Sequence, residues 1–150
     1  MDEYGGQLVL ATRSAITVRL ALANEGPLVG RLVAQHGGPQ WDWLDWTQVY
    51  PYWLIGEVEG VPRGTVMAVP GAPFGRVEFL CIDATLSHRQ KAVLARDLGY
   101  AAIASCQLMG SQAVLSTINA PGTGWDRIAT RRGWVNMGTG TLILKRITHE

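Results

Sequence analysis

Hydrophobic and polar residues alternate from Ala15 to Ala23, in the segment AITVRLALA, and this period of two predicts a strand with one buried face. The pattern then becomes helical. Asn24 is a favourable N-cap, and a short helix is predicted to end at the Gly37-Gly38-Pro39 stop. Its expected buried positions are Leu28, Leu32 and Gln35. A short apolar run before these elements, Leu8 to Ala11, predicts an extra edge strand.

The longest predicted helix runs from Ser87 to Met109 and follows the most continuous apolar segment of the chain, RVEFLCID at residues 76–83. That apolar segment predicts a central strand covered on both faces. The apolar positions with helical spacing are Leu94, Leu98, Ala101, Ala102 and Leu108. The other predicted elements are strands at 52–60 and 63–71 joined by a turn at 59–62, a strand at 112–118, a short helix at 125–133 closed by Gly133, and a final strand at 139–147.

This order of elements predicts an α+β, or mixed α/β, fold with helices on the faces of one sheet. The length of 150 residues suits one domain, so residues 1–14 are interpreted as an N-terminal extension and residues 15–150 as a single domain.

Composition places the chain among ordinary globular proteins. It is 47% hydrophobic and 17% charged with a formal net charge of +1, which excludes a strongly basic or disordered class and does not indicate nucleic acid as a partner. The two cysteines, Cys81 and Cys106, lie in an expected strand and an expected helix, so buried free thiols are favoured over a disulfide or a zinc site, and no metal is expected. The N-terminus does not resemble a signal peptide and no apolar run is long enough to span a membrane, so we expect a cytoplasmic protein.

Three segments of the chain resemble the GNAT acetyltransferase superfamily. ITVRLALANEGPLVGRLVAQ resembles its opening strand and helix, YWLIGEVEGVPRGTVMAV its hairpin, and DRIATRRGWVNMGTGTLILKRI its closing helix and strand. Residues 49–87 are also similar to short GNAT-like proteins that tailed bacteriophages encode among their virion genes. The resemblance implies a central mixed sheet of about six or seven strands with helices on both faces, acetyl-CoA as cofactor, and a location in the host cytoplasm or the virion.

The resemblance places the cofactor's pyrophosphate at the start of the long helix, in SHRQKA, where the family has the loop [QR]-x-x-G-x-[GA]. The residues that it implies for cofactor binding are Ile82, Ser87, His88, Arg89, Gln90, Lys91, Ala92 and Asn119. Gln90, or Lys91 in the next register, stands where the family has glycine. Ser87 and Gln90 instead form the S-x-x-Q pattern of a capping box, whose side chains take backbone donors that an anion would otherwise use.

The basic residues of this helix start, His88, Arg89 and Lys91, leave two interpretations open: a solvated helix end, or side chains that bind a phosphate directly. Asn119 likewise matches a cofactor-side position in the family or begins the NAPGTG turn.

Two catalytic roles of the family can be compared with the residues present. Its general acid, a tyrosine four residues before the closing glycine, corresponds to Ala129, which has no proton to donate. Its general base, a glutamate on the central strand, corresponds to Glu78. Glu78 acts as a base if its pKa is raised, or else faces solvent or pairs with a neighbouring arginine.

The aromatic segment WDWLDW contributes Trp41, Trp43 and Trp46 at the place where the family builds its acceptor-substrate wall. Tryptophans this close together are also typical of core packing, or of a surface for a protein partner or self-association. Two functional hypotheses follow: a GNAT-fold binding or structural component without efficient acyl transfer, in a phage particle, and an acetyl-CoA-dependent N-acetyltransferase that acts on an amine.

Overall fold

The computed structural model describes residues 15–37, 45–46, 52–117, 125–135 and 137. The chain divides into two compact units, Met1–Ser116 and Thr117–Glu150. The assignment of residues 15–150 to a single domain stays a prediction.

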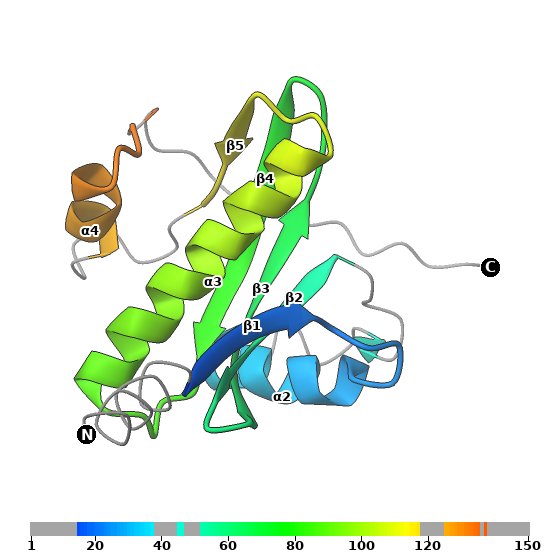
Figure 1. Cartoon of the computed structure of the whole chain (residues 1–150), viewed down its shortest axis with the longest axis vertical. Helices are drawn as coiled ribbons and strands as arrows, with labels where there is room; N and C mark the ends of the chain where they lie inside the picture. Colours follow the sequence, from blue (N-terminus) through cyan, green and yellow to red (C-terminus); the bar gives the residue numbers. More distant parts are fainter. Residues whose placement is uncertain (1–14, 38–44, 47–51, 118–124, 136, 138–150) are drawn as a thin grey trace, which may run out of the picture. The chain divides into compact units, whose positions relative to one another are not determined.

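The first unit contains a five-stranded mixed sheet in the order β1-β2-β3-β4-β5 (Figure 1). Neighbouring strands are antiparallel except β4 and β5, which run parallel and are joined by helix α3. The predicted strands at 8–11 and 139–147, which would raise the number to six or seven, lie outside the described residues. The elements are β1 (Ile16–Leu20), α2 (Gly26–Gly37), β2 (Trp53–Val58), β3 (Val61–Val69), β4 (Phe74–Ile82), α3 (His88–Leu108) and β5 (Ala113–Leu115).

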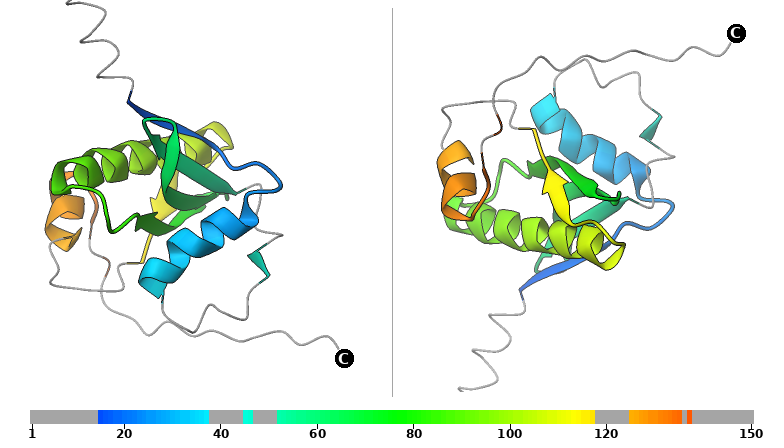
Figure 2. Two further views of the ribbon diagram at one scale, coloured as in Figure 1. Left: turned by 90° about the horizontal axis from the view of Figure 1, so that it is seen from below. Right: turned by 90° about the horizontal axis from the view of Figure 1, so that it is seen from above.

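Helices α2 and α3 cover opposite faces of this sheet (Figure 2). Alternate residues of β2 point to the two faces: Leu54 belongs to the cluster under α3, and Ile55 to the cluster under α2. The predicted mixed α+β fold with helices on both faces is therefore confirmed.

Helix α3 lies close to the sheet because three strands present a glycine beneath it. A Cβ atom at Gly56 would lie 2.5 Å from Leu94 Cδ1, and one at Gly64 would lie 3.0 Å from both Leu94 and Leu98. On β4, a Cβ atom at Gly75 would lie 3.0 Å from Cys106 Sγ. These distances are shorter than van der Waals contact, so side chains of α3 occupy the space above all three glycines.

The buried face of α3 differs in part from the predicted one. Leu94, Leu98 and Ala102 are fully buried as expected, but the predicted core residue Leu108 is 86% exposed. Leu108 is the last residue of the helix, so it projects beyond the face that packs on the sheet. The helix also buries Ala95, which the helical spacing did not select, and Cys106, which was predicted as a buried free thiol.

Helix α2 begins at Gly26, so the predicted N-cap Asn24 is wrong by one residue. The carbonyl of Glu25 accepts the first helical hydrogen bond, from Val29, and the Glu25 carboxylate accepts two hydrogen bonds from Arg19. Arg19 also donates to Glu57 of β2 and thereby ties the start of the helix to the sheet. The Arg19 guanidinium lowers the pKa of Glu25 below its usual value. The buried hydrophobic side chains of α2 are those of Val29, Leu32 and Val33, whereas the predicted position Gln35 is exposed.

The predicted hairpin is confirmed with a tighter turn. Strands β2 and β3 are joined by Glu59 and Gly60 alone. Both residues have positive φ, which is the pattern of a type I′ turn. Pro62 lies inside β3 rather than in the turn. Strand β4 begins at Phe74, before the predicted start at Arg76.

The second unit contains helix α4 (Trp125–Arg131), which is closed by Gly133 as predicted. Gly133 has a φ of 86°, its N–H donates to Thr130, and the N–H of Trp134 donates to Ala129. This pair of bonds is the Schellman motif, for which glycine is favoured because it adopts positive φ without strain.

Candidate functional site

Strand β4 has two distinct halves. Its first three residues, 74–76, pair with β5, and no described residue of β5 pairs with the rest of the strand. The register with β3 then shifts, so that two residues of β4, Phe79 and Leu80, lie opposite Val66 alone. Phe79 has a φ of 55°, which is unusual for a residue with a bulky side chain. This β-bulge lies in the strand that leads to α3, and backbone outliers of this kind are common at functional sites.

The backbone N–H groups of the connection from β4 to α3, residues 83–87, donate hydrogen bonds to acceptors within the chain. The N–H of Asp83 donates to the Arg63 carbonyl, and that of Leu86 to the Asp83 carbonyl. Side-chain oxygens accept the other three: Gln35 from Ala84 at 3.0 Å, Asp83 from Thr85 at 2.9 Å, and Gln90 from Ser87 at 3.1 Å. Every backbone N–H of this connection therefore already has an acceptor within the chain.

Helix α3 begins with the predicted capping box. The Ser87 hydroxyl accepts from the Gln90 N–H at 3.2 Å, and the Gln90 side chain accepts from the Ser87 N–H. In the first turn, the N–H groups of His88 and Arg89 are the donors that have no acceptor among the described residues. Two of the donors that an anion would use at this helix start are consequently occupied.

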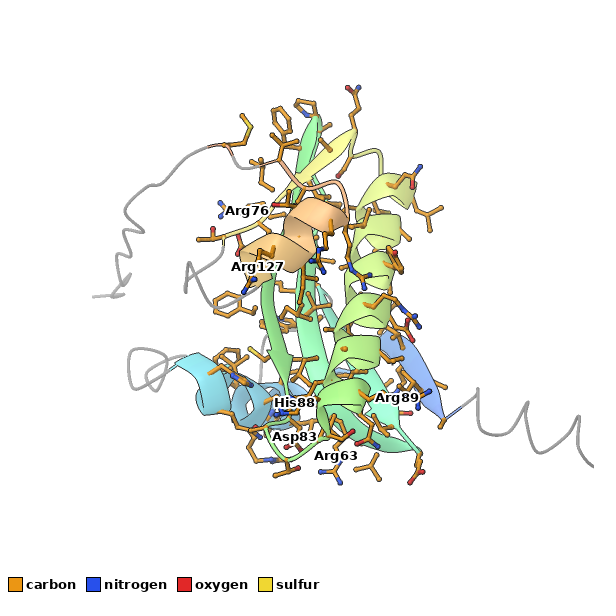
Figure 3. All side chains as sticks on the ribbon, turned by 90° about the vertical axis from the view of Figure 1, so that its left-hand side faces the viewer. Arg63, Arg76, Asp83, His88, Arg89 and Arg127 are labelled. Carbon is orange, nitrogen blue, oxygen red and sulfur yellow. The ribbon has the colours of Figure 1, made fainter. Side chains whose placement is uncertain are left out.

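The three basic residues of the helix start do not lie on one side of the helix. Figure 3 shows His88 and Arg89 on opposite sides of the first turn of α3. At about 100° per residue, Lys91 lies about 60° from His88 and about 160° from Arg89. One phosphate group can therefore meet His88 together with Lys91, but not all three side chains. Ala92, the last residue of the predicted loop, is exposed.

Asp83 connects the end of β4 to strand β3 and to its own loop (Figure 3). Its carboxylate accepts hydrogen bonds from the Thr85 N–H, the Thr85 hydroxyl at 2.8 Å and the Arg63 guanidinium at 2.9 Å. These donors, the Thr85 backbone first, lower the pKa of Asp83 to about 2. The carboxylate is thus ionised at neutral pH and fixes the geometry of the loop.

Replacing Asp83 with asparagine should lower the free energy of unfolding at pH 7 by up to about 2 kcal/mol. Because the folded pKa is below the unfolded value, the contribution of Asp83 is complete above about pH 4 and is lost as the pH falls toward 2. Urea unfolding of both proteins between pH 2 and 7 measures the effect, and the difference should shrink in acid. Asp97→Asn on α3 is the control, with an expected change within about 0.5 kcal/mol; equal losses in both variants would contradict this account.

The last turn of α2 contacts the same connection. Its Gln35 accepts the Ala84 N–H, and His36 Nε2 lies 2.6 Å from the Ile82 carbonyl oxygen. Because a carbonyl oxygen only accepts, Nε2 carries the proton in this bond. Ile82, a predicted cofactor-binding residue, therefore has its carbonyl engaged by α2, while its side chain packs in the cluster under α3. Sequence reasoning missed these two contacts of α2, because the partners are far apart in the chain.

Glu78, the predicted base, forms an ion pair with Arg76, two residues earlier on the same strand, at 2.9 Å. This is the pairing with a neighbouring arginine that the sequence left open as an alternative. The Glu78 side chain is only 13% exposed and lies next to the β-bulge.

Trp46, from the aromatic segment, is partly buried and packs against the hydrophobic cluster under α2. Its ring meets the edge of Trp53 with the centroids 5.9 Å apart, and a Cβ atom at Gly30 would lie 2.7 Å from its Cγ. This packing is one of the three alternatives for the segment, and the substrate-wall and partner-surface roles stay predictions. Trp41, Trp43 and the predicted cofactor residue Asn119 lie outside the described residues.

The buried cysteines do not supply a nucleophile. Burial raises the pKa of Cys81 to about 11 and also raises that of Cys106, so both thiols are protonated at neutral pH. Among the described residues, no group of three or more His, Cys, Asp or Glu side chains is placed to hold a metal ion.

Comparison with known proteins finds similarity in structure but not in sequence. No family model and no curated protein matches the chain. The ribosomal-protein-alanine N-acetyltransferase of Brucella melitensis aligns with a TM-score of 0.64 and 13% identity over 87% of this chain and 100% of that one. An aminoglycoside N-acetyltransferase in complex with CoA aligns with a TM-score of 0.63 and 15% identity over 88% and 95% of the two chains. The chain has the GNAT fold.

The GNAT fold alone does not establish an activity. A transcriptional regulator from Bacillus halodurans aligns equally well, with a TM-score of 0.65 and 10% identity over 87% of this chain and 99% of that one. At identities this low the similarity concerns the backbone, so the function must be argued from the residues of the site. In the part of the chain that the structure describes, no helix has the length and apolar character to cross a membrane.

Proposed function

We propose that this GNAT-fold protein is a non-catalytic binding or structural component whose acyl-CoA loop no longer holds the cofactor. The observation that carries the proposal is the hydrogen bonding of residues 83–87, where every backbone N–H is bonded within the chain. An anion at this connection would have to displace those bonds, and glutamine, or lysine in the next register, occupies the position where the family has glycine.

The state of the catalytic groups supports the same proposal. The residue at the position of the family's general acid is Ala129, and the carboxylate at the position of its base is paired with Arg76. A scaffold with neither group available would retain binding surfaces but transfer acyl groups slowly.

Calorimetric titration of the protein with acetyl-CoA tests the proposal directly. No heat of binding is expected up to millimolar cofactor, since the loop offers few free donors. A dissociation constant in the micromolar range would overturn the proposal, especially if Lys91→Ala abolished the binding. Thr117→Ala, on the short segment after β5, is the control and should leave the result unchanged.

The alternative function is an acetyl-CoA-dependent N-acetyltransferase that acts on an amine. The fold shared with a CoA-bound acetyltransferase favours it, as do His88 and Lys91, which share one side of the α3 start. In this function Glu78 is the base, released from Arg76 when the amine binds. Turnover of an amine that Glu78→Gln abolishes and Glu59→Gln preserves would establish it.

We further propose that the protein is encoded by a bacteriophage and associated with the virion, with the host cytoplasm as the alternative location. The support is the similarity of residues 49–87 to short GNAT-like phage proteins. In this role Trp41 and Trp43 would contact a protein partner or a second copy. Mass spectrometry of purified virions is the test, and consistent absence of the protein from them would remove this role.

A further inference from the structure

We infer that Gln35 and Gln90 determine whether the β4–α3 connection accepts a diphosphate, because their side-chain oxygens take two of its backbone donors. The inference rests on the proposed function, since it concerns the same connection and explains what closes it. Gln35 Oε1 accepts from the Ala84 N–H at 3.0 Å, and Gln90 Oε1 accepts from the Ser87 N–H at 3.1 Å.

The two glutamines are acceptors of the same chemical kind as a phosphate oxygen, but they are neutral and attached to the protein. A charged acceptor forms a hydrogen bond about twice as strong as a neutral one. The attached acceptor, however, loses no translational freedom when it binds, whereas a free ligand does. The glutamines therefore compete effectively with a dilute ligand for the same N–H groups.

Neither glutamine is needed for the core. Gln35 is exposed on the last turn of α2, and Gln90 is half-buried in the first turn of α3. Removing either side chain therefore opens no cavity in the hydrophobic clusters. The Asp83 side chain likewise accepts a backbone N–H of the connection, that of Thr85. It differs from the two glutamines because it also pairs with Arg63, so its loss would disturb the loop itself.

Gln90 contributes in two ways. Its side chain takes the Ser87 N–H, and it also accepts from the Ser87 hydroxyl, which in turn accepts the N–H of Gln90. Removing the Gln90 side chain thus frees one donor and loosens the hold of Ser87 on a second. Gln35 controls the Ala84 donor independently, from a different helix.

The experiment compares Gln35→Ala, Gln90→Ala and the double variant with the unchanged protein. CoA is titrated while the amide signals of Ala84 and Ser87 are followed by ¹H–¹⁵N NMR. Each single variant should bind CoA about tenfold more tightly than the unchanged protein, because a released donor bonds a charged oxygen. Gln107→Ala is the control, because its side chain is exposed on the last turn of α3 and makes no hydrogen bond to the described residues.

Folded variants that bind CoA no better than the unchanged protein would overturn the inference, with circular dichroism showing that they are folded. Micromolar binding of CoA by the unchanged protein would overturn the proposed function instead. The CoA affinities of the variants relative to the unchanged protein would still test whether the two glutamines limit binding. Dephospho-CoA, which keeps the diphosphate and lacks the 3′-phosphate, should show the same gain. A gain confined to CoA would assign the released donors to the 3′-phosphate and contradict the diphosphate assignment.

Discussion

Replacing Leu98 with alanine is expected to lower the free energy of unfolding by about 2 to 5 kcal/mol. Leu98 is fully buried on α3 and lies over both Gly56 and Gly64 of the sheet. The substitution removes the side chain that fills this space, and the strands beneath it are too rigidly paired to close the cavity completely. Urea denaturation followed by circular dichroism gives the value.

The matched control is Leu108→Ala on the same helix. Leu108 is 86% exposed, so its truncation should change the free energy of unfolding by no more than about 0.5 kcal/mol. The helical spacing of the sequence assigned both leucines to the core. Equal destabilisation by the two substitutions would support that assignment and contradict the packing of α3 described above.

Replacing Gly56 with alanine is expected to lower the free energy of unfolding by about 1 to 3 kcal/mol, although alanine suits a strand at least as well as glycine does. The new Cβ atom would lie 2.5 Å from Leu94 Cδ1, so Leu94 must leave its preferred rotamer or α3 must move away from the sheet. The comparison of melting temperatures and urea midpoints measures the loss.

Gly99→Ala, in helix α3, is expected to change the free energy of unfolding in the opposite direction. Gly99 is inside α3, and nothing lies within 4 Å of a Cβ atom placed there. The substitution should therefore stabilise the protein by about 0.5 to 1 kcal/mol, through the higher helix propensity of alanine. Destabilisation by Gly99→Ala, or stabilisation by Gly56→Ala, would show that α3 does not lie on the sheet in this way.

Local signals in the sequence predicted the local parts of this structure. The S-x-x-Q pattern located the start of α3 to the residue, since a capping box needs only Ser87 and Gln90. Gly133 was likewise identified from the sequence as the residue that closes α4. The N-cap of α2 was missed by one residue because the Glu25 carboxylate is engaged by Arg19, which also donates to Glu57, and this arrangement depends on neighbouring strands.

Of the hydrogen bonds at the candidate site, the sequence predicted the capping box but not the bonds between distant residues. The family resemblance located the cofactor loop at SHRQKA, and in the structure these residues begin α3 directly after the end of β4. The bonds from Gln35 to Ala84 and from Arg63 to Asp83 join residues that are distant in the chain, so no periodicity or motif reports them. Tertiary packing decides such contacts, and a single sequence carries no direct signal for them.

The bulge in β4 changes the phase of the strand. Before it, the odd-numbered residues Gly75 and Val77 face α3, and after it the odd-numbered residues Phe79 and Cys81 face α2. One extra residue therefore gives each half of the strand its own alternation. Deleting one residue at the bulge would restore a single alternation in which Val77 still faces α3 and Cys81 still faces α2, and it would remove the local irregularity between the two halves without exchanging their buried and exposed side chains.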